Sequence, residues 1–306
     1  MSIKSDMPSA EKIPRRTDKM TVAELLKSDK ITVSCELFPP KKGGELTAAK
    51  QTVAEMAKLS PAYMSVTYGA GGTNCDNSIE VANEVQNVNG ILALAHLTCV
   101  ASERDRIKEV LTQLKSLGIS NILALRGDMP SDGSGVRSTS FSHAYQLMQE
   151  IRDFGGFCVG GACYPEGHPE AESLEADIEH LKIKAEFGCE FLTSQMFFDN
   201  DAFYSFMYKL LRAGVDIPVT AGIMPVTNAK QIKRICTLSG AQLPRRFRAI
   251  VERFEGNPEA MRQAGIAYAT EQIIDLLANG INNIHIYSMN NPKIAGSIMT
   301  NLSEII

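Results

Sequence analysis

The 306-residue chain carries 31 lysines and arginines against 35 aspartates and glutamates, and 44% of its residues are hydrophobic. The net charge of −4 excludes a general electrostatic attraction to nucleic acid or anionic membranes, and no apolar run approaches the roughly 18 residues of a membrane span. Seven cysteines without a CxxC pair favour reduced, buried thiols in a cytoplasmic protein, and no cysteine–histidine cluster has the spacing of a metal site. Residues 1–20 lack the apolar core of a signal peptide and are interpreted as a flexible tail before a domain at 21–306.

Runs of β-branched and apolar residues that end in turn signals predict eight strands. The predicted strands are Ile31–Pro39, Tyr63–Gly69, Ile91–Cys99, Asn121–Asp128, Phe157–Pro165, Phe191–Asp199, Ile217–Pro225 and Asn283–Asn290. A segment with helical spacing of apolar residues follows each strand. These segments are Leu46–Ser60, Ser78–Val88, Glu103–Gly118, Phe141–Phe154, Ser173–Gly188, Asp201–Gly214, Asn228–Leu238 and Pro292–Ile306, with an extra segment Pro244–Gly256 and a long helix Pro258–Gly280 before the last strand.

Strict alternation of strands and helices predicts a parallel sheet with covered faces, and eight units without linker composition predict closure into a single-domain (βα)8 TIM barrel. Glycines that favour left-handed helix caps support the boundaries, at positions 118, 188, 214 and 280. The alternative, a doubly wound open sheet, normally carries GxGxxG after its first strand. The glycine cluster at 69–72 follows the second strand and does not have that pattern, so we reject a Rossmann site.

Polar residues stand at the ends of most predicted strands, although the strand bodies are apolar. In strand order they are Glu36, Thr67 and Tyr68, His96, Arg126 with Gly127 and Asp128, Tyr164 with His168, Gln195 and Tyr287. The C-terminal ends of the strands carry the active site in barrels of this kind. Because helices rather than water surround the strands, this asymmetry indicates function.

Glu36 lies in an otherwise apolar segment, where desolvation should raise its pKa and make it a candidate general acid. The alternative is a rim carboxylate paired with Lys41, Lys42 or an arginine. Arg126 could fork the oxygens of a phosphate or carboxylate beside a glycine that permits close approach, or it could simply pair with Asp128.

Asp177, His180 and Lys184 recur on one stripe of the helix predicted after the fifth strand. A carboxylate and an ammonium on one stripe could hold the ribose and phosphate of an extended ligand, although a solvated helix face is the commoner explanation. His285 is interpreted as a core histidine. These residues make a phosphate-containing ligand plausible, but they do not determine the reaction.

Eight segments of the chain, in order, resemble the flavin-containing catalytic barrel of methylenetetrahydrofolate reductase. They are CELFPPK, SVTYGAGG, HLTCV, LALRGDMP, YPEGHPEA, SQMFFD, GIMPVTN and HIYSMN, and they run from about residue 31 to residue 291. Eight motifs in the same order are far more specific than any one of them. The chain ends with the barrel, so the resemblance implies a short bacterial-type enzyme without a regulatory domain, and a homo-oligomer is an open expectation.

The resemblance assigns roles position by position. Glu36 matches the general acid, and Thr67 and Gln195 match residues that meet the nicotinamide donor. The matches to FAD-binding positions are Tyr68, Ala70, His96, Arg126, Gly127, Asp128, Tyr164, His168, Ala171, Asp177, His180 and Lys184. The matches to folate-binding positions are Asp128, Gln195 and Gln231.

The resemblance also implies a ping-pong reaction of one-carbon metabolism and methionine biosynthesis. NADH or NADPH would reduce FAD and leave, and methylenetetrahydrofolate would then be reduced to 5-methyltetrahydrofolate. Glu36 would protonate the bridging nitrogen, and Asp128 would favour the cationic folate.

Some positions depart from the family pattern. Asn291 and Ile183 stand where the family usually has arginines that contact folate and FAD, and the GGAC of the fifth strand is unusual. Two alternatives follow: a pterin-handling transferase on the same fold without flavin, and a flavoprotein subunit that is non-catalytic or depends on a partner.

Overall fold

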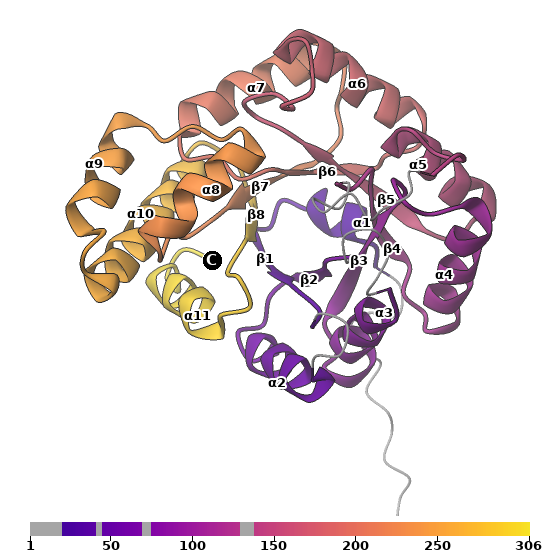
Figure 1. The fold of residues 1–306 in the computed structure, drawn as a ribbon, viewed down its shortest axis with the longest axis horizontal. Coiled ribbons are helices and arrows are strands. Elements are labelled where there is room, and N and C mark those ends of the chain that lie inside the picture. Colours follow the sequence, from indigo (N-terminus) through magenta and orange to yellow (C-terminus); the bar gives the residue numbers. More distant parts are fainter. Residues whose placement is uncertain (1–19, 41–44, 69–74, 129–137) are drawn as a thin grey trace, which may run out of the picture.

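The computed structural model describes residues 20–40, 45–68, 75–128 and 138–306. Eight parallel strands form a closed barrel in chain order, as Figure 1 shows, and β8 pairs with β1 through Thr32 and Asn283 to complete the ring. The strands are β1 (Thr32–Leu37), β2 (Tyr63–Val66), β3 (Leu92–Thr98), β4 (Asn121–Leu125), β5 (Cys158–Cys163), β6 (Phe191–Ser194), β7 (Val219–Ile223) and β8 (Asn283–Ile286). The predicted TIM barrel is therefore confirmed.

Helices surround the strands on the outside of the barrel (Figure 1). They are α2 (Leu46–Ala57), α3 (Cys75–Asn83) continued by a π-helix (Glu84–Val88), α4 (Arg104–Ser116), α5 (Ala144–Phe154), α6 (Leu174–Glu186), α7 (Asn200–Arg212), α8 (Ala229–Ser239), α9 (Arg245–Phe254), α10 (Pro258–Ala278) and α11 (Pro292–Asn301). Each predicted strand runs past the observed C-terminal end, and several residues beyond it, among them Arg126, Tyr164 and Gln195, line the rim of the barrel.

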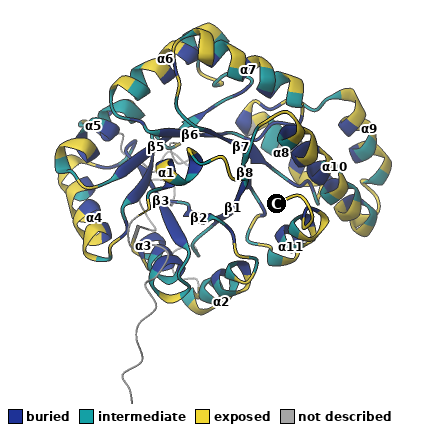
Figure 2. Cartoon of the chain, turned by 180° about the vertical axis from the view of Figure 1, so that it is seen from behind, coloured by how far each residue is buried: buried dark blue, intermediate teal, exposed yellow. Residues whose placement is uncertain are grey.

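Burial divides the molecule as the sequence pattern predicts. The strands are almost entirely buried, and the helices are exposed mainly on their outer faces (Figure 2). Of the six cysteines whose burial the structure describes, five are buried and Cys236 is half-buried. Among the described residues, none of the helices is both long and apolar enough for a membrane crossing, and no three His, Cys, Asp or Glu side chains are grouped to hold a metal.

A short helix that the sequence did not predict, α1 (Val22–Leu26), closes the N-terminal end of the barrel. Both views place it over the centre of the ring of strands (Figures 1 and 2). The Val22 N–H donates to Asn121 Oδ1 at 2.8 Å, and Asn283 Nδ2 donates to the Leu26 carbonyl at 3.0 Å. The helix packs into an apolar cluster that we call the plug: Val22, Ala23, Leu26, Tyr63, Leu92, Leu94, Leu123, Cys158 and Phe191.

The unusual glycines of β5 make room for this packing. A Cβ on Gly160 would lie 2.3 Å from the Phe191 ring, and a Cβ on Gly161 would lie 2.8 Å from Met148 Cε. Gly160 pairs with Phe191 across the sheet, so the ring occupies the space that a side chain on β5 would fill. Gly160 is thus explained by packing inside the barrel, and Gly161 by packing of the outer face of β5 against α5.

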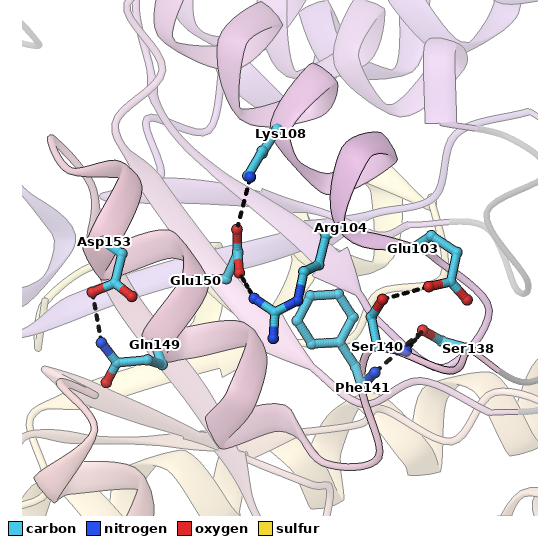
Figure 3. Close-up of polar contacts among 9 residues, drawn as sticks. All are labelled: Glu103, Arg104, Lys108, Ser138, Ser140, Phe141, Gln149, Glu150 and Asp153. Carbon is cyan, nitrogen blue, oxygen red and sulfur yellow. Dashed lines mark hydrogen bonds and ion pairs between the residues drawn. The ribbon is translucent and has the colours of Figure 1, made fainter.

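A polar cluster joins α4 to the segment that leads into α5 (Figure 3). Glu103 accepts hydrogen bonds from the Thr139 N–H at 2.8 Å and from the Ser140 hydroxyl. The Arg104 guanidinium lies 5.3 Å from the centre of the Phe141 ring and pairs with Glu150. These contacts hold the N-terminal end of α5 against the barrel.

Candidate active site

A cavity of about 720 Å³ opens at the C-terminal end of the barrel. Residues in or directly after each of the eight strands line it, together with residues from the first turns of α5 and from α6. Its volume falls within the roughly 300–1,000 Å³ of small-molecule and cofactor sites. The cavity and the plug occupy opposite ends of the same strands and meet at Leu94 and Leu123, which belong to both.

Most of the residues selected from the sequence line this one cavity. They are Glu36, His96, Arg126, Gly127, Asp128, Tyr164, His168, Ala171, Asp177, His180, Lys184 and Gln195. Thr67, Tyr68 and Gln231 do not line it: Tyr68 is buried, Thr67 uses its carbonyl to accept from Ser78 Oγ, and Gln231 is exposed on α8. Ala70 lies outside the described residues.

Glu36 is buried at the floor of the cavity, and this desolvation raises the pKa of its carboxyl to about 8. His96 Nε2 lies 3.9 Å from Glu36 Oε2, and burial lowers the pKa of His96 to about 4. Near neutral pH the carboxyl is therefore protonated and the imidazole is neutral. The alternative partners Lys41 and Lys42 lie outside the described residues.

His285 lies below Glu36 and is held from both sides. Ser34 Oγ donates to the Ile284 carbonyl at 3.0 Å and lies 2.7 Å from His285 Nδ1, so it accepts the Nδ1 proton. Ser65 Oγ lies 3.1 Å from Nε2 and donates to it. Burial lowers the pKa of His285 to about 3, which agrees with its interpretation as a core histidine.

Arg126 forms its salt bridge with Glu170 and not with Asp128. The two guanidinium nitrogens Nη1 and Nη2 lie 2.5 and 2.7 Å from the two Glu170 oxygens, and this pairing raises the pKa of Arg126. Gly127 has φ +82°, and a Cβ there would lie 2.8 Å from Thr98 Cβ. Packing against Thr98 therefore requires a glycine at this position, independently of any ligand in the cavity.

The stripe of Asp177, His180 and Lys184 on α6 faces the barrel. The alternative of a solvated helix face is therefore wrong for Asp177 and Lys184. Asp177 is buried and accepts a hydrogen bond from the His168 N–H at 3.0 Å. Lys184 Nζ donates to the Ala162 carbonyl at 2.8 Å, and burial lowers its pKa. Ile183 also lines the cavity, while His180 is exposed at its edge.

The opposite wall of the cavity carries Gln195, Met224 and Tyr287. Gln195 Oε1 accepts from the Met196 N–H at 2.9 Å, and Tyr287 donates its hydroxyl proton to the Ser194 carbonyl at 2.6 Å. Asn291 does not line the cavity: it caps α11 and accepts from the Lys293 and Ile294 N–H groups.

Sequence reasoning missed several residues of the cavity wall, notably Phe38 and the His143–Tyr145 segment at the start of α5. Asn290 fixes Phe38 through hydrogen bonds of 2.8 Å to its N–H and carbonyl. His143–Tyr145 lie at the first turn of the helix after β4, and the first turns of the other helices are positions where the sequence could likewise indicate lining residues.

A family model described as methylenetetrahydrofolate reductase matches residues 21–303 of the chain. The chain belongs to the methylenetetrahydrofolate reductase family. A rice protein named probable methylenetetrahydrofolate reductase (NADH) is 34% identical over 93% of this chain and 50% of its own length. 5,10-Methylenetetrahydrofolate reductases of Pectobacterium carotovorum and Salmonella typhimurium are 29% and 31% identical, covered over 93% and 89% of their lengths. The chain thus spans about half of the plant relative and most of these bacterial members of the methylenetetrahydrofolate reductase family.

A solved structure of a Clostridium thermocellum protein, described as binding two copies of 5-methyl-5,6,7,8-tetrahydrofolic acid, has the same fold. Its TM-score is 0.63 at 14% sequence identity, and the match covers 90% of this chain and 95% of that one. At this identity the likeness concerns the fold alone.

Proposed function

We propose that the chain reduces 5,10-methylenetetrahydrofolate to 5-methyltetrahydrofolate, with FAD as cofactor and NADH or NADPH as the hydride donor in a ping-pong reaction. The observation that carries the proposal is a buried carboxyl that keeps its proton at neutral pH on the floor of a large cavity. Membership of the family supports the reaction, and the names of plant relatives, which specify NADH, support a nicotinamide donor.

The wall formed by the end of β4, the loop after β5 and helix α6 fits a dinucleotide such as FAD. It combines the Arg126 guanidinium and the Lys184 ammonium with the buried carboxylate of Asp177. Cations suit phosphate oxygens, and a carboxylate suits ribose hydroxyls. FAD bound here would supply the hydride transfer between the nicotinamide and the folate.

Glu36 would act as the acid. Its pKa of about 8 means that it enters the reaction protonated near neutral pH and can donate this proton to the bridging nitrogen of the folate. The carboxylate that remains lies in a desolvated site, where it stabilises the cationic folate that forms. His96, whose pKa is about 4, stays neutral near neutral pH and therefore places no positive charge beside the cationic folate.

Asp128 and Gln195 would meet the substrate at the rim. Asp128 is exposed at the end of β4 beside Arg126, and its negative charge favours a cationic folate. Gln195 accepts from the Met196 N–H through Oε1, which leaves its Nε2 amide group to donate to a ligand. Thr67 and Gln231 do not line the cavity, so their roles in binding the donor and the folate are proposed from the resemblance alone.

Anaerobic half-reactions of the FAD-loaded protein test the proposal. NADH or NADPH should bleach the flavin, and methylenetetrahydrofolate should restore its colour. Glu36→Gln should leave the first half-reaction within about twofold and slow the second by roughly 10²–10⁴-fold, the usual contribution of a general acid. Glu190→Gln is the control, since this carboxylate accepts from the Val159 N–H near the other end of the barrel.

Each contrary outcome supports a different alternative. A protein that binds no flavin would favour the pterin-handling transferase. Bleaching by the nicotinamide without reoxidation by the folate would favour the partner-dependent subunit. If both half-reactions of Glu36→Gln keep the wild-type rates, Glu36 is not the acid.

A further inference from the structure

Glu170 has no role in the resemblance, yet it lies at the centre of the proposed cofactor wall. Its two carboxylate oxygens hold Nη1 and Nη2 of Arg126 at 2.5 and 2.7 Å. Its backbone N–H donates to His168 Nδ1 at 3.1 Å. One residue of the loop after β5 therefore contacts two side chains that line the cavity, one of them from the end of β4.

The Glu170 N–H determines the tautomer of His168. Because Nδ1 accepts this hydrogen bond, the proton of the neutral imidazole is on Nε2. The ring is fixed further by Tyr164, whose ring centre lies 4.6 Å away in an edge-on arrangement, and the His168 backbone N–H is bound to Asp177. His168 therefore has an N–H donor on Nε2.

The Glu170 carboxylate determines the orientation of Arg126. A bidentate pair fixes the plane of the guanidinium and uses one proton on each terminal nitrogen. The N–H on Nε and one further proton on each terminal nitrogen remain for a ligand. The Arg126 side chain is 29% exposed, so without this partner it would have room to adopt other rotamers.

We propose that Glu170 is a positioning residue of the cofactor wall, which orients the Arg126 guanidinium and fixes the Nε2–H tautomer of His168 so that both donate to an anionic dinucleotide. The proposal rests on the proposed function for the identity of this ligand. A competing effect is repulsion between the carboxylate and the phosphates. Glu170 is 64% exposed, so water and salt screen this repulsion, while the bidentate geometry persists.

Titration of the apo protein with FAD, followed by flavin fluorescence, tests the carboxylate. Glu170→Gln should raise the dissociation constant for FAD about three- to tenfold, the cost of ordering one long side chain on binding, and Glu170→Ala should raise it at least as much. Glu172→Gln is the matched control. Glu172 is exposed and lies two positions after Glu170, so this substitution removes the same charge from a neighbouring side chain. An unchanged or lower dissociation constant for Glu170→Gln would overturn the proposal.

A double-mutant cycle separates positioning from a general charge effect. In an Arg126→Ala background, Glu170→Gln should change FAD affinity by less than about twofold, since there is no guanidinium to orient. An equal effect in both backgrounds would contradict positioning. The melting temperature of each apo variant, measured in parallel, shows whether a loss of affinity reflects loss of folding.

The His168 tautomer gives a readout that does not depend on flavin. Nitrogen NMR of the imidazole at neutral pH should show a protonated Nε2 and an unprotonated Nδ1, and the reverse assignment would overturn this half of the proposal. If the wild-type protein binds no FAD, the proposed function fails. The NMR assignment and the coupling between Arg126 and Glu170 in thermal stability would still test whether Glu170 fixes the His168 tautomer and the Arg126 guanidinium.

Discussion

The two ends of the barrel are built from the same strands but have opposite chemistry. At the N-terminal end α1 and the plug exclude water with apolar side chains, and at the C-terminal end polar and ionisable groups line the cavity. Strand β6 shows the change over a few residues. Phe191 belongs to the plug, while Thr193 and Gln195, on the same face of the strand, line the cavity.

The apolar end stabilises the fold, whereas the end that carries the reactive groups lowers its stability. The plug gains free energy by burying apolar area, about 25 cal/mol per Å². The cavity keeps Glu36 and His96 in a desolvated setting that shifts both pKa values, which costs stability. Mutations at the two ends should therefore change stability with opposite signs.

The largest effect is expected in the plug. Phe191→Ala removes a fully buried ring and should destabilise the protein by about 3–5 kcal/mol, measured by denaturant unfolding. Gly160→Ala should also destabilise the protein, because the added methyl group meets the Phe191 ring. Replacing this ring with the smaller leucine side chain, in Gly160→Ala/Phe191→Leu, should recover part of the lost stability. A Phe191→Ala loss below about 1 kcal/mol would mean that the plug does not hold the barrel together.

At the cavity end Glu36→Gln should stabilise the protein. The folded-state pKa of about 8 is raised above that of an unfolded glutamate, so the stability from this group is fully present below about pH 4.5 and is lost as pH rises towards 8. At pH 7 the variant should gain roughly 3 kcal/mol over wild type, and at pH 4 the two should be equal. Unfolding curves at both pH values give the difference. A constant difference across this range would contradict the raised pKa.

The sequence was sufficient for the features that depend on local pattern. Strand positions, the glycine caps and the strand-end polar groups follow from the alternation of apolar runs and turn residues along the chain. Glu36 could be selected because a carboxylate in an apolar strand implies desolvation wherever the strand lies. Its burial and raised pKa agree with that argument.

The missed features depend on contacts between distant residues. Helix α1 has only five residues and docks through Asn121, 99 residues away from Val22, so no periodic pattern indicates it. Gly160 is explained only once Phe191 is known to lie opposite on β6. Arg126 has a nearby acidic candidate in Asp128, yet its partner Glu170 lies 44 residues away, in the loop after β5, whose course the sequence does not give.

The smallest effect is expected at the flank between the two ends, where Glu150 of α5 pairs with Arg104 and Lys108 of α4. Glu150 is buried, but both cations are 55% exposed, so the pair is largely solvated on one side. Glu150→Gln should cost about 1 kcal/mol in denaturant unfolding, and Glu109→Gln, which removes an exposed partner of Arg106, should cost less than about 0.5 kcal/mol. A loss of 3 kcal/mol or more for Glu150→Gln would show that this polar flank supports the barrel as strongly as the plug does. Stability would then not be concentrated at the N-terminal end, and the start of α5, which lines the cavity, would belong to the supporting structure as well.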